Sequence, residues 1–132
     1  MRDLKSALIC LAMFGLLCGC KKSGLLDYRN RYVGTYECNK KTEWLIFNGS
    51  DTPTVEVTNE LIAVTIEKVR HNNGKIEITA NNVHRIVEID KNGNGSGSFS
   101  PYTGYTIELT KKEIKYVEDD KYGETTIVGT KR

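Results

Sequence analysis

Oxygen-bearing side chains alternate along residues 90–95, where the sequence reads DKNGNG. Asp90, Asn92 and Asn94 have the spacing with which a calcium-binding loop begins, and their oxygens could converge on a hard cation. A complete loop of that kind needs a bidentate carboxylate at its twelfth position, which here is Pro101. We therefore interpret the stretch as a polar hairpin loop and predict no metal site, with a weak one-carboxylate cation site as the alternative.

The histidines and serines form no recognisable catalytic pattern. His71 adjoins an Asn-Asn-Gly turn and His84 lies in an alternating segment, and neither has a second His or Cys at ligand spacing. Ser96, Ser98 and Ser100 lie in a Gly-rich stretch that lacks the sequence around an activated nucleophile. The carboxylates alternate outward along predicted strands instead of forming a pair. We therefore predict a protein that is not an enzyme and uses no cofactor.

Aromatic residues are the side chains that most suggest binding. Rings with polar tips can line a pocket for an apolar or sugar-like ligand, and they can equally contact a protein partner. Core filling is the expectation for most of them, because a small barrel has little room beyond its own side chains. Tyr102 and Tyr105, next to Pro101 and Gly104 in a predicted loop, are expected to be the most exposed. The candidate ligand-binding residues are Tyr36, Trp44, Tyr102, Tyr105 and Tyr116.

The segments that must position these residues have the period of β-strands. Apolar and polar residues alternate over 62–67, 75–79 and 105–110, and the chain is rich in β-branched residues. Arg85 breaks the pattern, since it falls on the apolar face of its segment. Asn73-Gly74 has the residue types of a two-residue type I′ hairpin turn. One helical turn over 27–31, capped by Asp27, is the only helix expected after residue 20.

Eight to ten strands are expected, depending on which short runs merge. Short connections favour antiparallel neighbours, and a long meander avoids exposed edges best by closing on itself. We therefore predict an all-β fold, a small antiparallel up-and-down β-barrel of about eight strands, with two packed sheets as the alternative. The predicted strands are 33–39, 43–47, 54–57, 62–70, 75–80, 83–89, 98–99, 105–110, 113–118 and 125–131.

The length of 132 residues suits one domain, and its first twenty residues have the order of an export signal. Arg2 and Lys5 form a basic start, and an apolar stretch follows over residues 6–17. That stretch is shorter than the roughly 20 apolar residues that a membrane-spanning helix needs. A secretory signal is the interpretation that fits this length.

Leu17-Cys18-Gly19-Cys20 resembles the lipobox of bacterial lipoproteins, which has an aliphatic residue three positions before the modified Cys and a small residue directly before it. The resemblance implies cleavage after Gly19, acyl chains on Cys20 and anchoring to a membrane. Lys21 follows the Cys, which in the enterobacterial sorting pattern implies the outer membrane. The expected division is a signal peptide at 1–19, a lipidated tether at 20–27 and a barrel domain at 28–132. A signal cut without lipidation, or a buried helix, is the alternative.

Removal of the signal peptide changes the number of cysteines and of charged residues in the mature chain. Cys38 becomes the only Cys besides Cys20, so we expect no disulfide within the domain and a buried, inert thiol at Cys38. Seventeen basic and sixteen acidic residues remain once Arg2, Lys5 and Asp3 are lost. This balance excludes nucleic-acid binding by bulk charge and indicates no other charged partner.

Gly34-Thr35-Tyr36, just after the expected helical turn, resembles the Gly-x-Trp start of lipocalins, with Tyr in the place of Trp. In lipocalins a basic residue of the last strand packs across that aromatic ring, and Lys131 or Arg132 could take this place. The chain therefore looks like a small bacterial lipocalin-like lipoprotein over residues 27–132. The resemblance implies non-enzymatic binding of a small apolar ligand. The alternative is a protein-interaction module, either a hydrolase inhibitor or an accessory subunit of an envelope complex.

Overall fold

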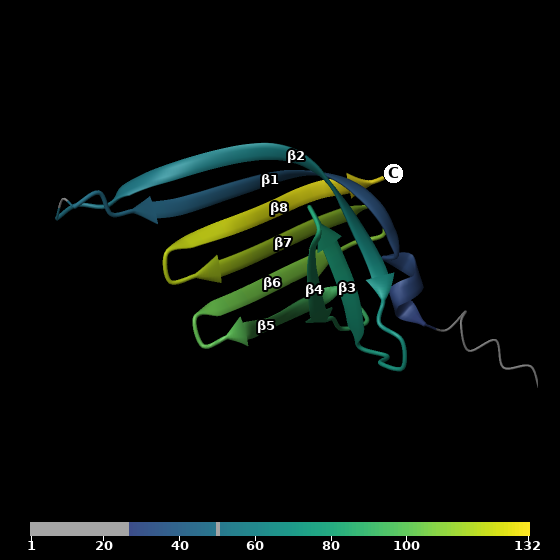
Figure 1. Ribbon diagram of the computed structural model, residues 1–132. Coiled ribbons are helices and arrows are strands. Elements are labelled where there is room, and N and C mark those ends of the chain that lie inside the picture. Colours follow the sequence, from purple (N-terminus) through teal and green to yellow (C-terminus); the bar gives the residue numbers. More distant parts are fainter. Residues whose placement is uncertain (1–26, 50) are drawn as a thin grey trace, which may run out of the picture.

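The computed structural model describes residues 27–49 and 51–132, so the predictions for the signal peptide and Cys20 lie outside the described residues. One eight-stranded antiparallel sheet curls into a nearly closed up-and-down barrel (Figure 1), which confirms the predicted fold class. In chain order its elements are a 3₁₀ helix η2 (Tyr28–Arg31) and the strands β1 (Gly34–Ile46), β2 (Thr54–Lys68), β3 (Lys75–Ala80), β4 (Val83–Glu88), β5 (Asn94–Ser100), β6 (Thr103–Leu109), β7 (Glu113–Asp120) and β8 (Gly123–Lys131).

The first and last strands of the barrel are paired, and the barrel is open only between β4 and β5. The order across the sheet is β4-β3-β2-β1-β8-β7-β6-β5, so β1 pairs with β8 and each other neighbour is consecutive in the chain. Strands β4 and β5 stand at the two ends of this order. They meet at one end only, where the Asp90 amide donates to the Asn94 carbonyl over 2.8 Å. The seam of the barrel therefore lies between β4 and β5.

The first hairpin is longer than the sequence pattern predicted. The expected strands 33–39 and 43–47 merge into β1, and 54–57 and 62–70 merge into β2. Residues 40–42 continue as strand because they pair with β2 on one side and with β8 on the other. The far end of this hairpin extends past the neighbouring strands (Figure 1). We call its residues 43–47 and 54–57 the arm.

The core fills the barrel at the end closed by η2. It is built from the inward residues of the alternating segments, as the period of two predicted. Tyr36 is fully buried, and its hydroxyl donates to the Tyr32 carbonyl over 2.7 Å. The other large side chains that are fully buried are Tyr32, Ile66, Ile76, Ile107, Ile114, Val64 and Val87.

The tight type I′-like turn lies between the predicted strands 75–80 and 83–89, where the sequence also indicated a turn, and not at Asn73-Gly74. Asn81 and Asn82 connect β3 to β4 and both have positive φ, 48° and 63°. Asn73-Gly74 lies instead in the longer β2–β3 connection, and neither residue there has positive φ. The Asn72 carboxamide accepts from the Gly74 amide over 3.2 Å, so a side chain organises that loop. Asparagine adopts the left-handed backbone region at lower cost than most residues, so Asn81 and Asn82 can form the two-residue β3–β4 connection.

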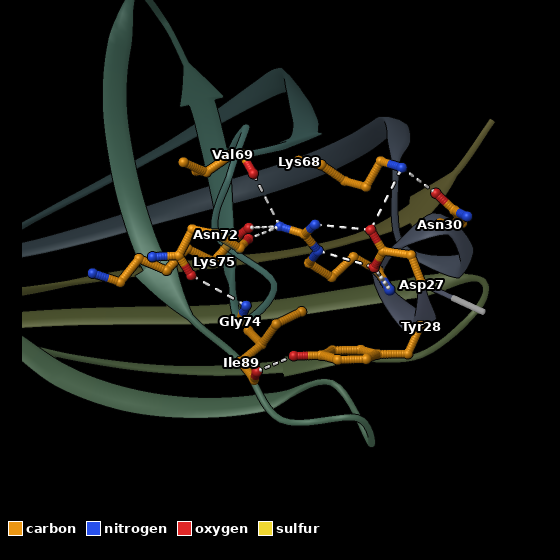
Figure 2. Close-up of polar contacts among 10 residues, drawn as sticks. Asp27, Tyr28, Asn30, Lys68, Val69, Asn72, Gly74, Lys75 and Ile89 are labelled. Carbon is orange, nitrogen blue, oxygen red and sulfur yellow. Dashed lines mark hydrogen bonds and ion pairs between the residues drawn. The ribbon is translucent and has the colours of Figure 1, made fainter. Parts of the chain in front are cut away.

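Helix η2 closes one end of the barrel by means of a buried arginine (Figure 2). The predicted cap is confirmed, since an Asp27 carboxylate oxygen accepts from the Arg29 amide over 3.0 Å. The Arg29 guanidinium then donates to the carbonyls of Val69 (3.1 Å), Lys75 (2.7 Å) and Asn72. It also forms an ion pair of 2.8 Å with Asp27, which holds the pKa of that carboxyl at about 2. One side chain thus ties the helix to the β2–β3 connection.

Candidate functional site

A pocket of about 190 Å³ lies between the β3–β4 hairpin and the inner face of β1, β7 and β8. The pocket lies toward the end of the barrel opposite η2. Its floor is apolar and includes Ile78, Ala80 and Ile127. Its remaining lining residues are Lys40, Asn81, Val83, Arg85, Tyr116, Glu118 and Thr125.

An ion pair crosses from β4 to β7 at the edge of this pocket. The Arg85 guanidinium donates to both carboxylate oxygens of Glu118, over 3.0 Å from Nε and 2.9 Å from Nη2. The Tyr116 hydroxyl donates to the same carboxylate over 2.7 Å. These donors, Arg85 foremost, lower the pKa of Glu118, whereas burial raises the pKa of Tyr116. The carboxylate is therefore ionised near neutral pH and held in one position.

This ion pair explains the irregular alternation of the Val83–Glu88 strand. Arg85 shares the inner face with its cross-strand partner Ile78, although most inward positions are apolar. Its charge is balanced by Glu118, and its guanidinium lies 5.1 Å from the centroid of the Phe99 ring. The sequence contained the signal for this site, a lone cation on an apolar face, but nothing in the local pattern identified Glu118 as its partner.

Tyr105 covers the seam between β4 and β5 next to the pocket. Its ring stacks on Phe99 at 4.8 Å between centroids, and its hydroxyl accepts from the Glu88 amide over 3.1 Å. The ring reaches across β5 because Gly97 has no side chain, and a Cβ there would lie 2.9 Å from the ring. Tyr105 is thus buried, and the expectation that it would be exposed in a loop was wrong because β6 starts at Thr103.

The five candidate binding residues do not form one cluster. Tyr116 lines the pocket, and Tyr105 stacks against it with centroids 6.4 Å apart. Tyr36 lies in the core, and Trp44 is half-exposed on the arm. Tyr102 is 72% exposed in the β5–β6 connection. The pocket residues that sequence reasoning did not single out for binding are Lys40, Ile78, Ala80, Asn81, Val83, Arg85, Glu118, Thr125 and Ile127.

The oxygen-rich stretch at residues 90–95 covers most of the β4–β5 connection and the start of β5. One oxygen of the Asp90 carboxylate accepts from the amides of Asn92 (2.8 Å) and Asn94 (2.9 Å). The side chain thereby closes a turn, so the stretch is a polar loop as predicted, but the loop is not part of a hairpin because β4 and β5 are not paired neighbours in the sheet. Within the part of the chain that the structure describes, no three His, Cys, Asp or Glu side chains are grouped so that they could hold a metal ion.

Cys38 and His84, which the sequence analysis considered for reactivity and metal binding, both lie outside the pocket. Cys38 is buried, as expected, and burial raises the pKa of its thiol to about 11. His84 is exposed on β4, where its Nδ1 lies 2.8 Å from a carboxylate oxygen of Glu77 on β3. Cys38 is therefore part of the core and His84 part of a cross-strand pair, and neither side chain lines the pocket.

Comparison with known proteins adds no relative: no protein-family model matches the chain, and no curated protein or solved structure matches it. None of the helices in the described ranges is both long and apolar enough to cross a membrane. The class that the coordinates define is therefore an all-β, nearly closed eight-stranded barrel, compatible with a lipocalin-like fold.

Proposed function

We propose that this protein is a bacterial lipoprotein, anchored at the outer membrane through acyl chains on Cys20, whose lipocalin-like barrel binds a small, mainly apolar molecule without transforming it. The observation that carries the binding proposal is the pocket between the β3–β4 hairpin and the inner face of β1, β7 and β8. The anchoring part rests on the lipobox resemblance alone.

The size of the pocket restricts the ligand. An engineered apolar cavity of about 150 Å³ binds benzene, whereas sites for drug-sized ligands measure about 300–1,000 Å³. A volume of about 190 Å³ therefore suits a single ring or a short branched chain. The apolar floor of Ile78, Ala80 and Ile127 would contact the body of such a molecule.

The polar lining restricts the orientation of the ligand. Lys40 and Arg85 contribute two cations to the lining, and Glu118 contributes the one carboxylate. An anionic or hydrogen-bond-accepting head group would compete with Glu118 for Arg85 or lie near Lys40. We therefore expect one polar group at the mouth and the apolar body inward.

Ligand binding can be tested on residues 21–132, because all eight strands and every core residue of the described chain lie within them. The domain, secreted by its own host and purified, is measured by native mass spectrometry. NMR titrations with hexanoate, hexanol and hexylammonium then report the preferred head group. We expect a small retained mass, or chemical-shift changes at Ile78, Ala80 and Ile127, with hexanoate the best of the three probes.

A pair of substitutions shows whether binding occurs in the pocket. Ala80→Phe places a ring in the pocket, whereas Val128→Phe adds the same ring on the exposed side of β8, next to Ile127. Binding should be lost in Ala80→Phe and retained in Val128→Phe. A bare mass together with unchanged spectra for all three probes would refute the ligand-binding proposal.

The exposed arm favours protein interaction as the second candidate function. Its apolar side chains lie in solvent together with Tyr122 of the β7–β8 connection, against whose ring Phe47 packs edge to face. Strand β3 pairs with β2 only from Val64 to Lys68, so residues 54–63 form a sheet edge without a pairing strand in the described chain. Edges of this kind accept an extended segment of a partner. The exposed apolar residues of the arm are Trp44, Leu45, Phe47, Val55 and Val57.

Site-specific photocrosslinking in the host tests this second function. A crosslinker at Val57 on the arm is compared with one at Ile86, which is similarly exposed on β4. A discrete adduct from position 57 alone would support an inhibitor or accessory-subunit role. Adducts from neither position would count against it.

A further inference from the structure

The charges of this barrel are sorted by its two ends although the sequence is nearly neutral. One end carries η2, the β2–β3, β4–β5 and β6–β7 connections and the C-terminus, while the arm and the β7–β8 connection lie at the other (Figure 1). We call the first of these the basic end. Its exposed cations are Arg31, Lys68, Arg70, Lys91, Lys111, Lys112 and Arg132.

The carboxylates of the connections at the basic end are already engaged. Asp27 is bound by Arg29 and lies 3.6 Å from the Lys68 ammonium. Asp90 accepts from two amides of its own turn. Glu37 on β1 pairs with Arg132. Four exposed glutamates on the strand ends next to these connections form no ion pair with a described residue, and they offset part of the positive charge: Glu67, Glu88, Glu108 and Glu113. The other five of these cations form no ion pair with a described residue, so their charge faces solvent.

The opposite end has the reverse balance. Its exposed or half-buried acidic residues outnumber the two nearby cations, Lys41 and Lys121, and Lys41 is paired with Glu43 over 2.8 Å. The barrel therefore has an electric dipole along its length, which the near-zero net charge conceals. The acidic residues at that end are Glu43, Asp51, Glu56, Asp119, Asp120 and Glu124.

We infer that the basic end is a docking surface for the anionic head groups of a phospholipid membrane. Asp27, the first described residue, belongs to this end, so a chain anchored at Cys20 would bring these cations to the bilayer surface. Lys21 and Lys22 add two cations between the anchor and the barrel. The inference takes its membrane from the proposed anchoring, but the electrostatic contact is a property of the barrel itself.

The spacing of the cations favours a surface over a small anion. They are spread over η2, the end of β2, three connections and the C-terminus, and no buried side-chain nitrogen or oxygen of the described residues is left without a hydrogen-bond partner. Spread charge of this kind suits a plane of head groups, where each Lys or Arg near an anionic surface increases affinity about fivefold at low salt. A basic patch of this sort also strengthens the attachment given by acyl chains. The arm would then extend away from the membrane.

Vesicle binding by residues 21–132, without acyl chains, tests the inference. The probes are vesicles of phosphatidylcholine alone and of equimolar phosphatidylcholine and phosphatidylglycerol. The double variant Lys111→Glu/Lys112→Glu reverses two charges at the basic end, and Lys41→Glu/Lys121→Glu makes the same change of net charge at the arm end. Circular dichroism checks that both variants are folded.

The wild-type domain should bind only the anionic vesicles, and salt should weaken the binding. Lys111→Glu/Lys112→Glu should weaken it roughly tenfold or more, and the control pair by less than about twofold. Equal losses in the two variants, or no binding of the wild type, would overturn the inference. Tighter binding to heparin than to anionic vesicles would also overturn it, since a soluble polyanion would then be the partner. None of these outcomes depends on Cys20, whose acylation is tested separately by fractionation.

Discussion

The ammonium of Lys131, near the end of the last strand, lies 5.9 Å from the centroid of the Tyr36 ring on the first strand. The same ammonium donates to the Arg31 carbonyl over 3.3 Å, so it joins β8, β1 and the end of η2. Gly34 makes the approach possible, since it has a φ of 145° and a Cβ there would lie 2.6 Å from the Lys131 side chain. This is the arrangement that the resemblance of Gly34-Thr35-Tyr36 to the lipocalin start implied.

Truncation of the Tyr36 ring should strongly destabilise the fold. Tyr36→Ala removes a fully buried ring and leaves a cavity, for which we expect a loss of about 3–5 kcal/mol in the free energy of unfolding. Urea denaturation measures the loss. Tyr122→Ala, at a half-exposed ring, is the matched control and should cost less than about 1 kcal/mol. A similarly small cost for Tyr36→Ala would argue against the role of this ring as the anchor of the closure.

Acid should weaken the attachment of η2 through Asp27. Arg29 lowers the pKa of this carboxyl from its ordinary value of 3.8 to about 2 in the folded protein. A depressed folded-state pKa contributes stability above the unfolded pKa, and that stability is lost as the pH falls from about 4 to about 2. After allowance for screening by solvent we expect a contribution of roughly 1 kcal/mol.

Urea denaturation between pH 5 and pH 2 measures this contribution. Asp27→Asn should be less stable than the wild type at pH 5, and the difference should shrink toward pH 2. A difference that stays constant over this range would contradict the assignment to the Asp27 charge.

The Arg85–Glu118 pair should show energetic coupling across the pocket. Arg85→Met and Glu118→Gln each leave one partner without its counter-charge, so the double variant should lose less stability than the sum of the two single variants. For a bidentate pair that is partly open to solvent we expect a coupling of roughly 1 kcal/mol. A double-mutant cycle by urea denaturation measures it. Strictly additive losses would show that the contact does not hold β4 to β7.

Replacement of Cys20 tests the anchor. In the native host, Cys20→Ala should transfer the protein from the membrane fraction to the soluble fraction, because the acyl chains provide the stable attachment. Cys18→Ala, two residues earlier, is the control and should leave the protein with the membrane. Retention of the Cys20→Ala variant in a detergent-dependent fraction would contradict lipidation at this residue.

Local patterns predicted the barrel well but not its seam. The alternating segments became β3, β4, β6 and β7 with ends within about two residues of those expected, because a period of two separates core from solvent on any sheet. No local pattern predicted that β4 and β5 would be the strands that fail to pair along their length. The contacts at this seam act between elements: the Tyr105 hydroxyl accepts from the Glu88 amide, and Gly95 of β5 lies so close to β4 that a Cβ there would be 2.0 Å from the Glu88 carbonyl oxygen.

The position of the hairpin turn and the ion pair at the pocket were likewise decided by contacts between elements and not by local sequence patterns. Asn73-Gly74 had the stronger local preference for a hairpin turn, yet Asn81-Asn82 forms it, because Arg29 binds the carbonyls of the longer connection. Arg85 stood out as a cation on an apolar face, but Glu118, which follows it by 33 positions, became its partner only through the curvature of the sheet.

The sequence by itself determined the fold class, the cap of η2 and the buried state of Tyr36 and Cys38, because alternation, turn residues and caps act over a few neighbouring positions. The tertiary structure alone decided where the pocket lies, which charges pair and that the remaining cations gather at one end. Net charge is a sum over the chain, whereas an electrostatic surface depends on which connections the strand order brings to the same end of the barrel.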